Sequence, residues 1–256
     1  MFRAQMNEAG TLKKIVESIK DIVTNVNIDA GPNGISMQAM DPSHVALVNL
    51  NLKAEGFADY RADKTFPLGI KLANLNKILK VGGNDDTLTL ECEDEPTQLN
   101  IKFENGGIQS SQFSLNLISL DSEQLQIPET TYTSSIVMPT SDFSNICRQL
   151  HQLSESVTIK TTQKSIVFEV NGDIGNGSLE RKDNASDKVN EQTIINVDEP
   201  VSNMFSLSIL NYFNKAASLS DQVQLSLSEN TPLVVEYKIG EMGSLKFYLA
   251  PKLNDE

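Results

Sequence analysis

The sequence predicts an α+β protein with two similar halves, made mostly of antiparallel β-sheet with four helices set singly among the strands. Many short segments alternate apolar and polar residues, which is typical of strands with one buried face. Turn signals such as Asn33-Gly34 and Asn105-Gly106-Gly107 separate these segments. The order helix, turn, strand, turn, strand in residues 72–104 recurs in residues 207–239, which indicates an internal duplication.

The strands are predicted from strict alternation and the helices from apolar residues spaced three and four apart. The clearest strands are 34–40, 87–93, 98–104, 165–170 and 222–228. Helices are expected at 11–23, 72–80, 141–151 and 207–217. Each has an apolar stripe that would face a sheet: Leu12, Ile15, Val16, Ile19, Ile22 and Val23; Leu72, Leu75, Ile78 and Leu79; Phe143, Ile146, Cys147 and Leu150; and Ile209, Leu210, Phe213 and Ala217.

The duplication also extends upstream, because "FRAQMNEAGTLKKIVESI" and "SIVMPTSDFSNICRQL" both read as a strand followed directly by an amphipathic helix. We therefore expect a first domain at residues 1–117, a connector at 118–134 and a second domain at 135–256. The connector is polar, yet it contains the apolar residues Leu125, Ile127 and Pro128, which a simple tether does not need.

Composition sets the class of protein. With 256 residues and 39% hydrophobic residues, the chain can bury a substantial core. No stretch has the roughly 20 apolar residues that span a bilayer, and the start lacks a secretory layout. We expect a soluble intracellular protein with no membrane partner. Cys92 and Cys147 have no metal-type spacing and are expected to be buried thiols.

The charge distribution is uneven. The net charge is −13, which taken alone argues against nucleic-acid binding. The 44 residues of the four predicted helices nevertheless hold seven Lys or Arg and only three Asp or Glu. For a single helix, lysine is explained as a good helix former on a solvated face. A basic bias on all four helices instead suggests one surface that contacts the phosphates of a polyanion.

The catalytic patterns in the sequence are weak. Asp41, Ser43 and His44 in "DPSH" are nearly adjacent, and no GxSxG elbow frames the serine. "GDIGNG" at 172–177 does not open a helix, so it is not a nucleotide loop. We predict no enzymatic activity, no metal and no cofactor. A β-rich hydrolase using His44 and Asp41 is the rival from another functional class.

Blocks in order along the whole chain resemble the eukaryotic DNA sliding clamp family. They are "MDPSHVALV", "FADYR", "NKILK", "LDSEQLQIPE", "FSNICRQL", "GDIGNG", "PLVVEYKI" and "GSLKFYLAPK", followed by an acidic C-terminus. The resemblance implies a ring of three identical two-domain subunits, with sheets outside and helices lining a hole for duplex DNA. Such a ring holds polymerases on DNA by topological confinement and high effective concentration. The alternative within this class is a subunit of a heterotrimeric checkpoint-type clamp.

The resemblance also implies three sets of site residues. Cations of the helices would contact DNA phosphates without sequence specificity, although Asn145 is uncharged where the family has a basic residue. Edge strands at 108–116 and 175–182 would join neighbouring subunits. A groove beneath the connector would bind a partner peptide containing a glutamine and paired aromatic residues. The implied residues are Lys13, Lys14, Lys20, Lys77, Lys80, Arg148 and Lys215 for DNA; Ser110, Phe113, Leu115, Gly175, Gly177 and Leu179 for the subunit interface; and Met40, His44, Val45, Leu47, Leu125, Ile127, Pro232, Tyr248, Ala250, Pro251 and Lys252 for the groove.

Partners and regulation follow from the same resemblance. The expected partners are duplex DNA, further copies of the chain, DNA polymerase, an ATP-dependent clamp loader, flap endonuclease, DNA ligase and other proteins with the clamp-interacting motif. These roles in replication, repair and translesion synthesis imply the nucleus. The family's ubiquitin-acceptor lysine aligns with Gln163, so its neighbour Lys164 is the candidate acceptor here.

Overall fold

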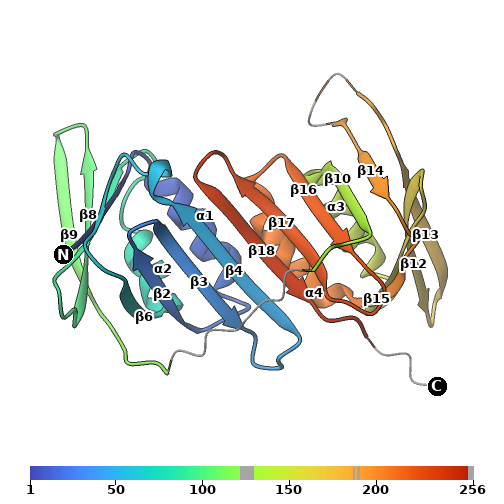
Figure 1. The fold of residues 1–256 in the computed structure, drawn as a ribbon, viewed down its shortest axis with the longest axis horizontal. Helices are drawn as coiled ribbons and strands as arrows, with labels where there is room; N and C mark the ends of the chain where they lie inside the picture. The colour runs from blue at the N-terminus through green and yellow to red at the C-terminus, as the bar shows by residue number, and fades with distance from the viewer. Residues whose placement is uncertain (122–129, 187, 189–190, 253–256) are drawn as a thin grey trace. The chain divides into compact units, whose positions relative to one another are not determined.

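A computed structural model of the chain describes residues 1–121, 130–186, 188 and 191–252. The connector residues Leu125 and Ile127 lie outside these described residues. The chain divides into two compact units, shown in Figure 1. Unit 1 comprises Met1–Pro42, Val48–Gln126 and Ile239–Leu245, and unit 2 comprises Ser43–Leu47, Ile127–Lys238 and Lys246–Glu256.

Unit 1 contains two groups of antiparallel strands. One is a five-stranded sheet in the order β5-β1-β7-β8-β9, and the other has the order β4-β3-β2-β6. Within the first, Phe113 of β9 lies opposite Ile101 of β8. The strands are β1 (Phe2–Met6), β2 (Asn25–Gly31), β3 (Gly34–Met40), β4 (Ala46–Lys53), β5 (Asp59–Ala62), β6 (Phe66–Lys71), β7 (Thr87–Cys92), β8 (Gln98–Asn105) and β9 (Gln109–Asn116).

Unit 2 repeats this arrangement. Its strands form one group in the order β14-β10-β16-β17-β18 and a four-stranded sheet in the order β13-β12-β11-β15. Leu179 of β13 lies opposite Phe168 of β12. The strands are β10 (Ser134–Pro139), β11 (Ser156–Thr161), β12 (Ser165–Gly172), β13 (Gly175–Lys182), β14 (Ile194–Val197), β15 (Ser202–Ser206), β16 (Gln222–Leu227), β17 (Leu233–Ile239) and β18 (Gly243–Leu249).

The two units share one strand order. When β1 is matched to β10 and the count continues along the chain, each strand of unit 1 occupies the sheet position of its counterpart in unit 2. The helices also fall at matching points, after β1 and β6 in one unit and after β10 and β15 in the other. The strand order therefore confirms the predicted duplication. The two halves have low sequence identity, so the sequence alone showed only a shared order of elements.

The helices are α1 (Ala9–Ile19), α2 (Leu72–Leu79), α3 (Thr140–Leu150) and α4 (Leu207–Phe213). In each unit the two helices contact one another. In unit 2, α3 contacts β10 and β16 while α4 contacts β11 and β15, so the helix pair covers both groups of strands. All four helices bury an apolar face, as amphipathic spacing predicts.

Two helix predictions needed correction. The first helix ends at Ile19, and Ile22 and Val23 lie in a turn whose amides bond back to the carbonyl of Ile19. Both residues are buried, so the apolar pattern continued after the helix had ended. The fourth helix tightens into the 3₁₀ segment η3 (Asn214–Leu219).

The buried face of the fourth helix differs from the predicted stripe. Leu207, Leu210 and Phe213 of α4 are buried, together with Asn214 and Ala216 of η3, while the predicted Ile209 and Ala217 are only half-buried. A 3₁₀ helix has three residues per turn, so Ala216, three residues after Phe213, takes the buried position instead of Ala217.

Both cysteines are free and buried, as predicted. Burial raises the pKa of the Cys92 thiol to about 11 and that of Cys147 to about 12. Among the described residues, no group of three or more His, Cys, Asp or Glu could hold a metal ion. No helix in the part of the chain that the structure describes is long and apolar enough to cross a membrane.

Candidate functional site

The helix surface of unit 1 carries most of the predicted DNA-contacting cations. Lys14, Lys77 and Lys80 are exposed, and none of them makes an ion pair within the described residues. Each lies opposite a buried apolar stripe, such as Leu72, Leu75 and Leu79 on α2. These three ammonium groups are therefore available to phosphates.

Lys20 lies at the C-terminal cap of α1 and is partly engaged. Its ammonium lies 3.4 Å from the carboxylate of Glu17 and 3.0 Å from that of Asp21. The hydrogen bond with Asp21 is the main reason that the pKa of Lys20 is raised. Lys20 therefore stays charged, but the carboxylates of Glu17 and Asp21 partly compensate its charge.

Lys13 is less exposed than helical periodicity suggests. Its side chain is half-buried, and its ammonium donates to the backbone carbonyl of Gly82 and, at 3.2 Å, to Oδ1 of Asn84. Lys13 therefore holds the turn after α2. Helical periodicity placed it on the solvent side but could not show that this turn lies within reach.

Two of the seven predicted DNA-contacting cations belong to unit 2, and both are exposed. Arg148 is exposed and donates to Oδ1 of Asn145 at 2.6 Å. Lys215 is exposed, with its ammonium 5.0 Å from the ring centroid of Tyr212, itself 43% exposed. Asn145 and Tyr212 are neutral, so these two contacts orient the cations without cancelling their charge.

The predicted interface segments are edge strands in the described part of the chain. β9 is the last strand of the five-stranded sheet, and β13 is the last strand of the four-stranded sheet. Edge strands expose unpaired backbone amides and carbonyls that can pair with another chain. Both edges are eight residues long, so they could pair along their whole length.

The predicted interface residues differ in how far they are exposed. Ser110 and Gly175 are exposed, while Phe113, Gly177 and Leu179 are half-buried. Leu115 is only 5% exposed and belongs to the core of its own unit, so it is poorly placed to contact another chain. Phe113 meets Phe103 edge-on, with ring centroids 6.2 Å apart.

Sequence reasoning missed apolar residues beside these edges. Val81 is 59% exposed next to the β8–β9 hairpin, and Leu153 is 36% exposed next to Gly177 of β13. The tips of the two hairpins carry Ile174, which is 80% exposed, and Ile108, which is 90% exposed and begins the predicted interface segment 108–116. A single apolar residue in a turn has no periodicity, so only the structure identifies Val81, Leu153 and Ile174.

The predicted peptide groove is partly described in unit 2. The amide of Ala250 donates to the carbonyl of Val45 at 2.9 Å, which joins the end of β18 to residues 43–47. Val45, Leu47, Tyr248, Ala250 and Pro251 are half-buried, His44 and Pro232 are exposed, and the half-buried Met40 belongs to unit 1.

Two features of this region were not predicted. Tyr132 is half-buried, and this burial raises its pKa, with a smaller contribution from Tyr248. Lys252 is tied to the sheet through its amide to Met204 and its ammonium to Oγ of Ser156 at 2.6 Å. Backbone strain marks one further position, because His44 has a φ of 58°.

Lys164 lies in the turn between β11 and β12 and is exposed, as is Gln163. The hydroxyl of Thr162 accepts hydrogen bonds from the amides of Lys164 and Ser165, which fixes the turn. The ammonium of Lys164 therefore projects from a well-defined backbone.

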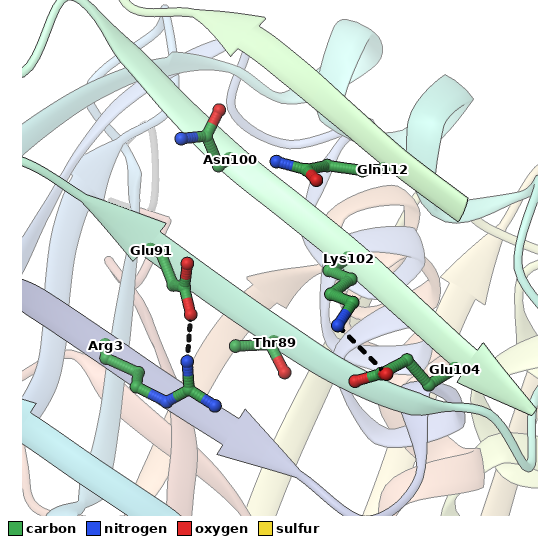
Figure 2. A pocket seen from close by; sticks show the side chains of 7 residues that line it. All are labelled: Arg3, Thr89, Glu91, Asn100, Lys102, Glu104 and Gln112. Atoms are coloured by element: carbon green, nitrogen blue, oxygen red, sulfur yellow. Dashed lines mark hydrogen bonds and ion pairs between the residues drawn. The ribbon is translucent and has the colours of Figure 1, made fainter. Parts of the chain in front are cut away.

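A polar hollow on the five-stranded sheet is a second candidate site. Figure 2 shows it, with a volume of about 190 Å³. Arg3 pairs with Glu91 and Asp59, and Lys102 pairs with Glu104 at 2.9 Å. Because these charges compensate one another, the hollow offers little excess charge to a ligand. Its lining residues are Arg3, Thr89, Glu91, Asn100, Lys102, Glu104 and Gln112.

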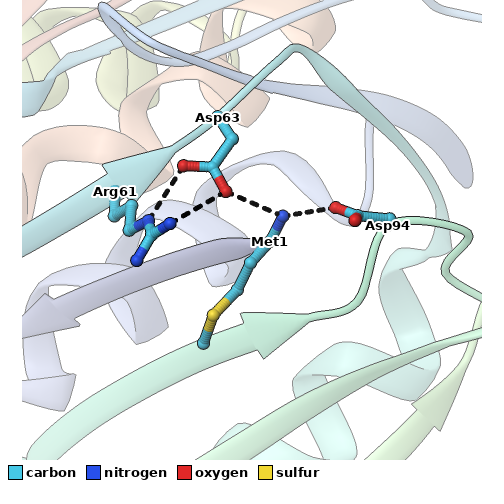
Figure 3. Close-up of polar contacts among 4 residues, drawn as sticks. All are labelled: Met1, Arg61, Asp63 and Asp94. Carbon is cyan, nitrogen blue, oxygen red and sulfur yellow. Dashed lines mark hydrogen bonds and ion pairs between the residues drawn. The ribbon is translucent and has the colours of Figure 1, made fainter.

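A second polar cluster fixes the start of β1 (Figure 3). The Met1 amine donates to Asp94 and, at 3.2 Å, to Asp63, which also pairs with Arg61 at 2.9 Å. Hydrogen bonding, chiefly from Arg61, lowers the pKa of Asp63. This cluster joins three segments of unit 1 and has the character of a surface ion network.

Comparison with known proteins decides the family. Residues 1–125 match the family described as proliferating cell nuclear antigen, N-terminal domain, and residues 126–252 match the C-terminal domain of the same antigen. The chain belongs to the proliferating cell nuclear antigen family. A curated protein of that name from Chaetomium thermophilum is 45% identical over 258 residues, covering 100% of both chains.

Membership of the proliferating cell nuclear antigen family confirms two predictions. The chain has the two-domain clamp fold, with mostly antiparallel sheets and four helices. It is a DNA sliding clamp of the replication and repair machinery, and the checkpoint-type alternative is not favoured. The clamps of this family are not enzymes, which disfavours the hydrolase reading of His44 and Asp41.

Proposed function

We propose that three copies of this chain close head to tail into a ring around duplex DNA. The observation that carries the proposal is the pair of open edge strands, β9 in unit 1 and β13 in unit 2. In a head-to-tail interface, a surface of one copy binds a different surface of the next copy. The repeated contact closes into a ring when the rotation between neighbouring copies allows it. Pairing the edges would also satisfy backbone groups that otherwise invite aggregation.

The basic helix surface supports the DNA-binding part of the proposal. Lys14, Lys77 and Lys80 would contact phosphates directly, with Lys20, Arg148 and Lys215 adding charge. Contacts with phosphates alone carry no sequence information, so a ring held this way could slide. Lys13 also stays a predicted phosphate contact, because the oxygens of Gly82 and Asn84 that its ammonium binds are neutral and leave its charge uncompensated.

The hydrogen bond between Ala250 and Val45 supports a docking site for partner peptides, because it holds residues 43–47 beside the end of β18. An apolar groove with polar ends suits a short segment bearing aromatic anchors. We assign this site to DNA polymerase, flap endonuclease, DNA ligase and other proteins with the clamp-interacting motif. The connector residues Leu125 and Ile127 stay part of this prediction. The ring would act without catalysis or cofactor, in the nucleus, and an ATP-dependent loader would open it.

Lys164 is proposed as the modified lysine of the β11–β12 turn. Its exposure and the fixed turn backbone suit access by a conjugating enzyme. In an in vitro ubiquitination reaction, the Lys164→Arg variant should not be modified at this turn. The control variant Gln163→Arg should be modified as the wild type is. Equal modification of both variants would reject the assignment.

The test of the ring is the mass in solution, measured by light scattering after size exclusion. A closed homotrimer should give about 85 kDa, three times the chain mass of 28.2 kDa. A mass near 28.2 kDa at micromolar concentration would contradict self-closure and point to an obligate partner subunit.

A further inference from the structure

The turn after α2 connects the helix surface to the proposed subunit seam, the pairing of β9 with β13 of the next copy. Val81, Gly82 and Gly83 follow Lys80, the C-terminal cap of α2. Together with Phe103, Gln109 and Ser111 they border a hollow of about 150 Å³. Gln109 and Ser111 belong to β9, so the hollow opens beside the edge strand. The full lining is Val81, Gly82, Gly83, Asp86, Phe103, Asn105, Gln109 and Ser111.

The turn packs tightly on the aromatic pair behind the edge. A Cβ atom on Gly82 would lie 2.2 Å from the Phe103 ring, so only glycine allows this approach. The ring of Phe103 in turn meets that of Phe113 on β9. The position of the turn therefore sets the packing behind the edge strand.

Polar contacts from the start of α1 fix the same turn. The amide of Gly10 donates to the carbonyl of Asn84 at 2.9 Å, and the amide of Ala9 donates to that of Asp86 at 2.8 Å. The half-buried Lys13 adds its ammonium to the carbonyl of Gly82 and to the side chain of Asn84. The amide of Gly83 also donates to the carboxylate of Asp86 at 2.6 Å. Lys13 is the side chain of α1 that reaches this turn, so replacing it removes its own contacts without changing the turn itself.

We propose that Lys13 is a positioning residue of the subunit seam: by fixing the turn at Gly82, it holds the exposed Val81 beside β9, where Val81 contacts an apolar side chain of the next copy of the chain. Val81 is 59% exposed, and the edge strand beside it is open, so the surface is continuous with the proposed interface. Leu153, 36% exposed beside β13, gives the opposite edge a matching apolar side chain. This inference rests on the proposed homotrimer.

Lys14 provides a matched control for the experiment. It is the next residue, carries the same charge and is exposed, without the contacts that Lys13 makes to the turn. Lys13→Ala should raise the concentration at which the trimer dissociates by about tenfold, the effect of losing one charged hydrogen bond. Lys14→Ala should leave that concentration unchanged. Analytical ultracentrifugation over a dilution series measures both.

Two further variants separate a local effect from misfolding. Lys13→Met keeps the apolar stem and removes the charge, and it should weaken the trimer as Lys13→Ala does. Val81→Asp changes an exposed side chain, so the monomer should keep its circular dichroism while the trimer weakens. Trimers of Lys13→Ala and Val81→Asp as stable as wild type would overturn the inference. A wild-type chain that never trimerises would instead overturn the proposed ring and this inference with it.

Discussion

The guanidinium of Arg181 on β13 pairs with the carboxylate of Asp142 in the first turn of α3. This contact neutralises a charge of the edge strand inside its own unit. Lys182 and Glu180 of the same strand also approach each other at 3.8 Å. The opposite edge, β9, has the sequence QSSQFSLN and contains no ionisable side chain. The seam is therefore expected to depend on backbone pairing and apolar contact rather than on charge.

We predict that trimer stability is nearly independent of salt. Between 0.05 and 0.5 M NaCl the dissociation concentration should change by less than about threefold, because screening acts only on charges. Ultracentrifugation at both salt concentrations measures it. Binding of the same preparation to duplex DNA should weaken steeply over this range and serves as the control. A trimer that falls apart at high salt would reveal charge pairing across the seam.

Removing three exposed lysines of the helix surface of unit 1 should weaken DNA binding without affecting assembly. In the triple variant Lys14→Ala, Lys77→Ala and Lys80→Ala, the slope of log affinity against log salt should fall by about 0.9 for each phosphate that is no longer neutralised. Fluorescence anisotropy with duplex DNA measures the slope, and light scattering checks the trimer.

A control triple keeps the same change in net charge. Lys53, Lys64 and Lys238 are exposed and lie outside the helices. Replacing these three by alanine should leave the salt slope close to that of wild type. An equal decrease of the slope in both triples would mean that net charge, rather than the helix surface, governs binding.

Truncating apolar side chains of the groove should weaken peptide binding. Leu47→Ala combined with Tyr248→Ala should cost about 2 kcal/mol or more for a peptide with a glutamine and paired aromatics, since buried anchors dominate such sites. Leu125→Ala with Ile127→Ala is expected to act in the same direction. Isothermal titration calorimetry measures both, and Ile194→Ala, at an apolar residue of β14 that is 37% exposed, is the control. Unchanged affinity would remove the altered residues from the site.

Stability should fall on the alkaline side of neutrality. Burial raises the pKa of Cys92, Cys147 and Tyr60 above their ordinary values, to about 11, 12 and 12. Above pH ~9 the unfolded chain loses these protons first, so it binds fewer protons than the native state and unfolding is favoured. The urea midpoint should therefore drop between pH 8 and pH 10.5.

The same burial predicts unreactive thiols. Only the thiolate reacts, and both sulfhydryl groups are buried with raised pKa values. At pH 8 a thiol reagent should modify neither Cys92 nor Cys147 in the native protein and both in 6 M guanidinium chloride. Rapid modification of the native chain would show that one of them is accessible.

Local patterns predicted much of the fold correctly. The alternating segment 34–40 is β3 to the residue, and 222–228 matches β16 within one residue. Alternation works here because each strand has one buried face, so sequence period and burial coincide. Where burial continued past a helix, as at Ile22 and Val23, the pattern gave the wrong boundary.

By itself, the sequence determined the strands, the four amphipathic helices, the duplication and the basic bias of the helices, because these depend on residues close together in the chain. Only the tertiary structure decided that Leu115 is buried in its own unit, that Val81 lies exposed beside β9, and that Lys13 bonds to the turn at Gly82. These facts depend on sheet order or on the approach of segments far apart in the chain. Helical period gives the direction of a side chain but cannot say which distant backbone meets it.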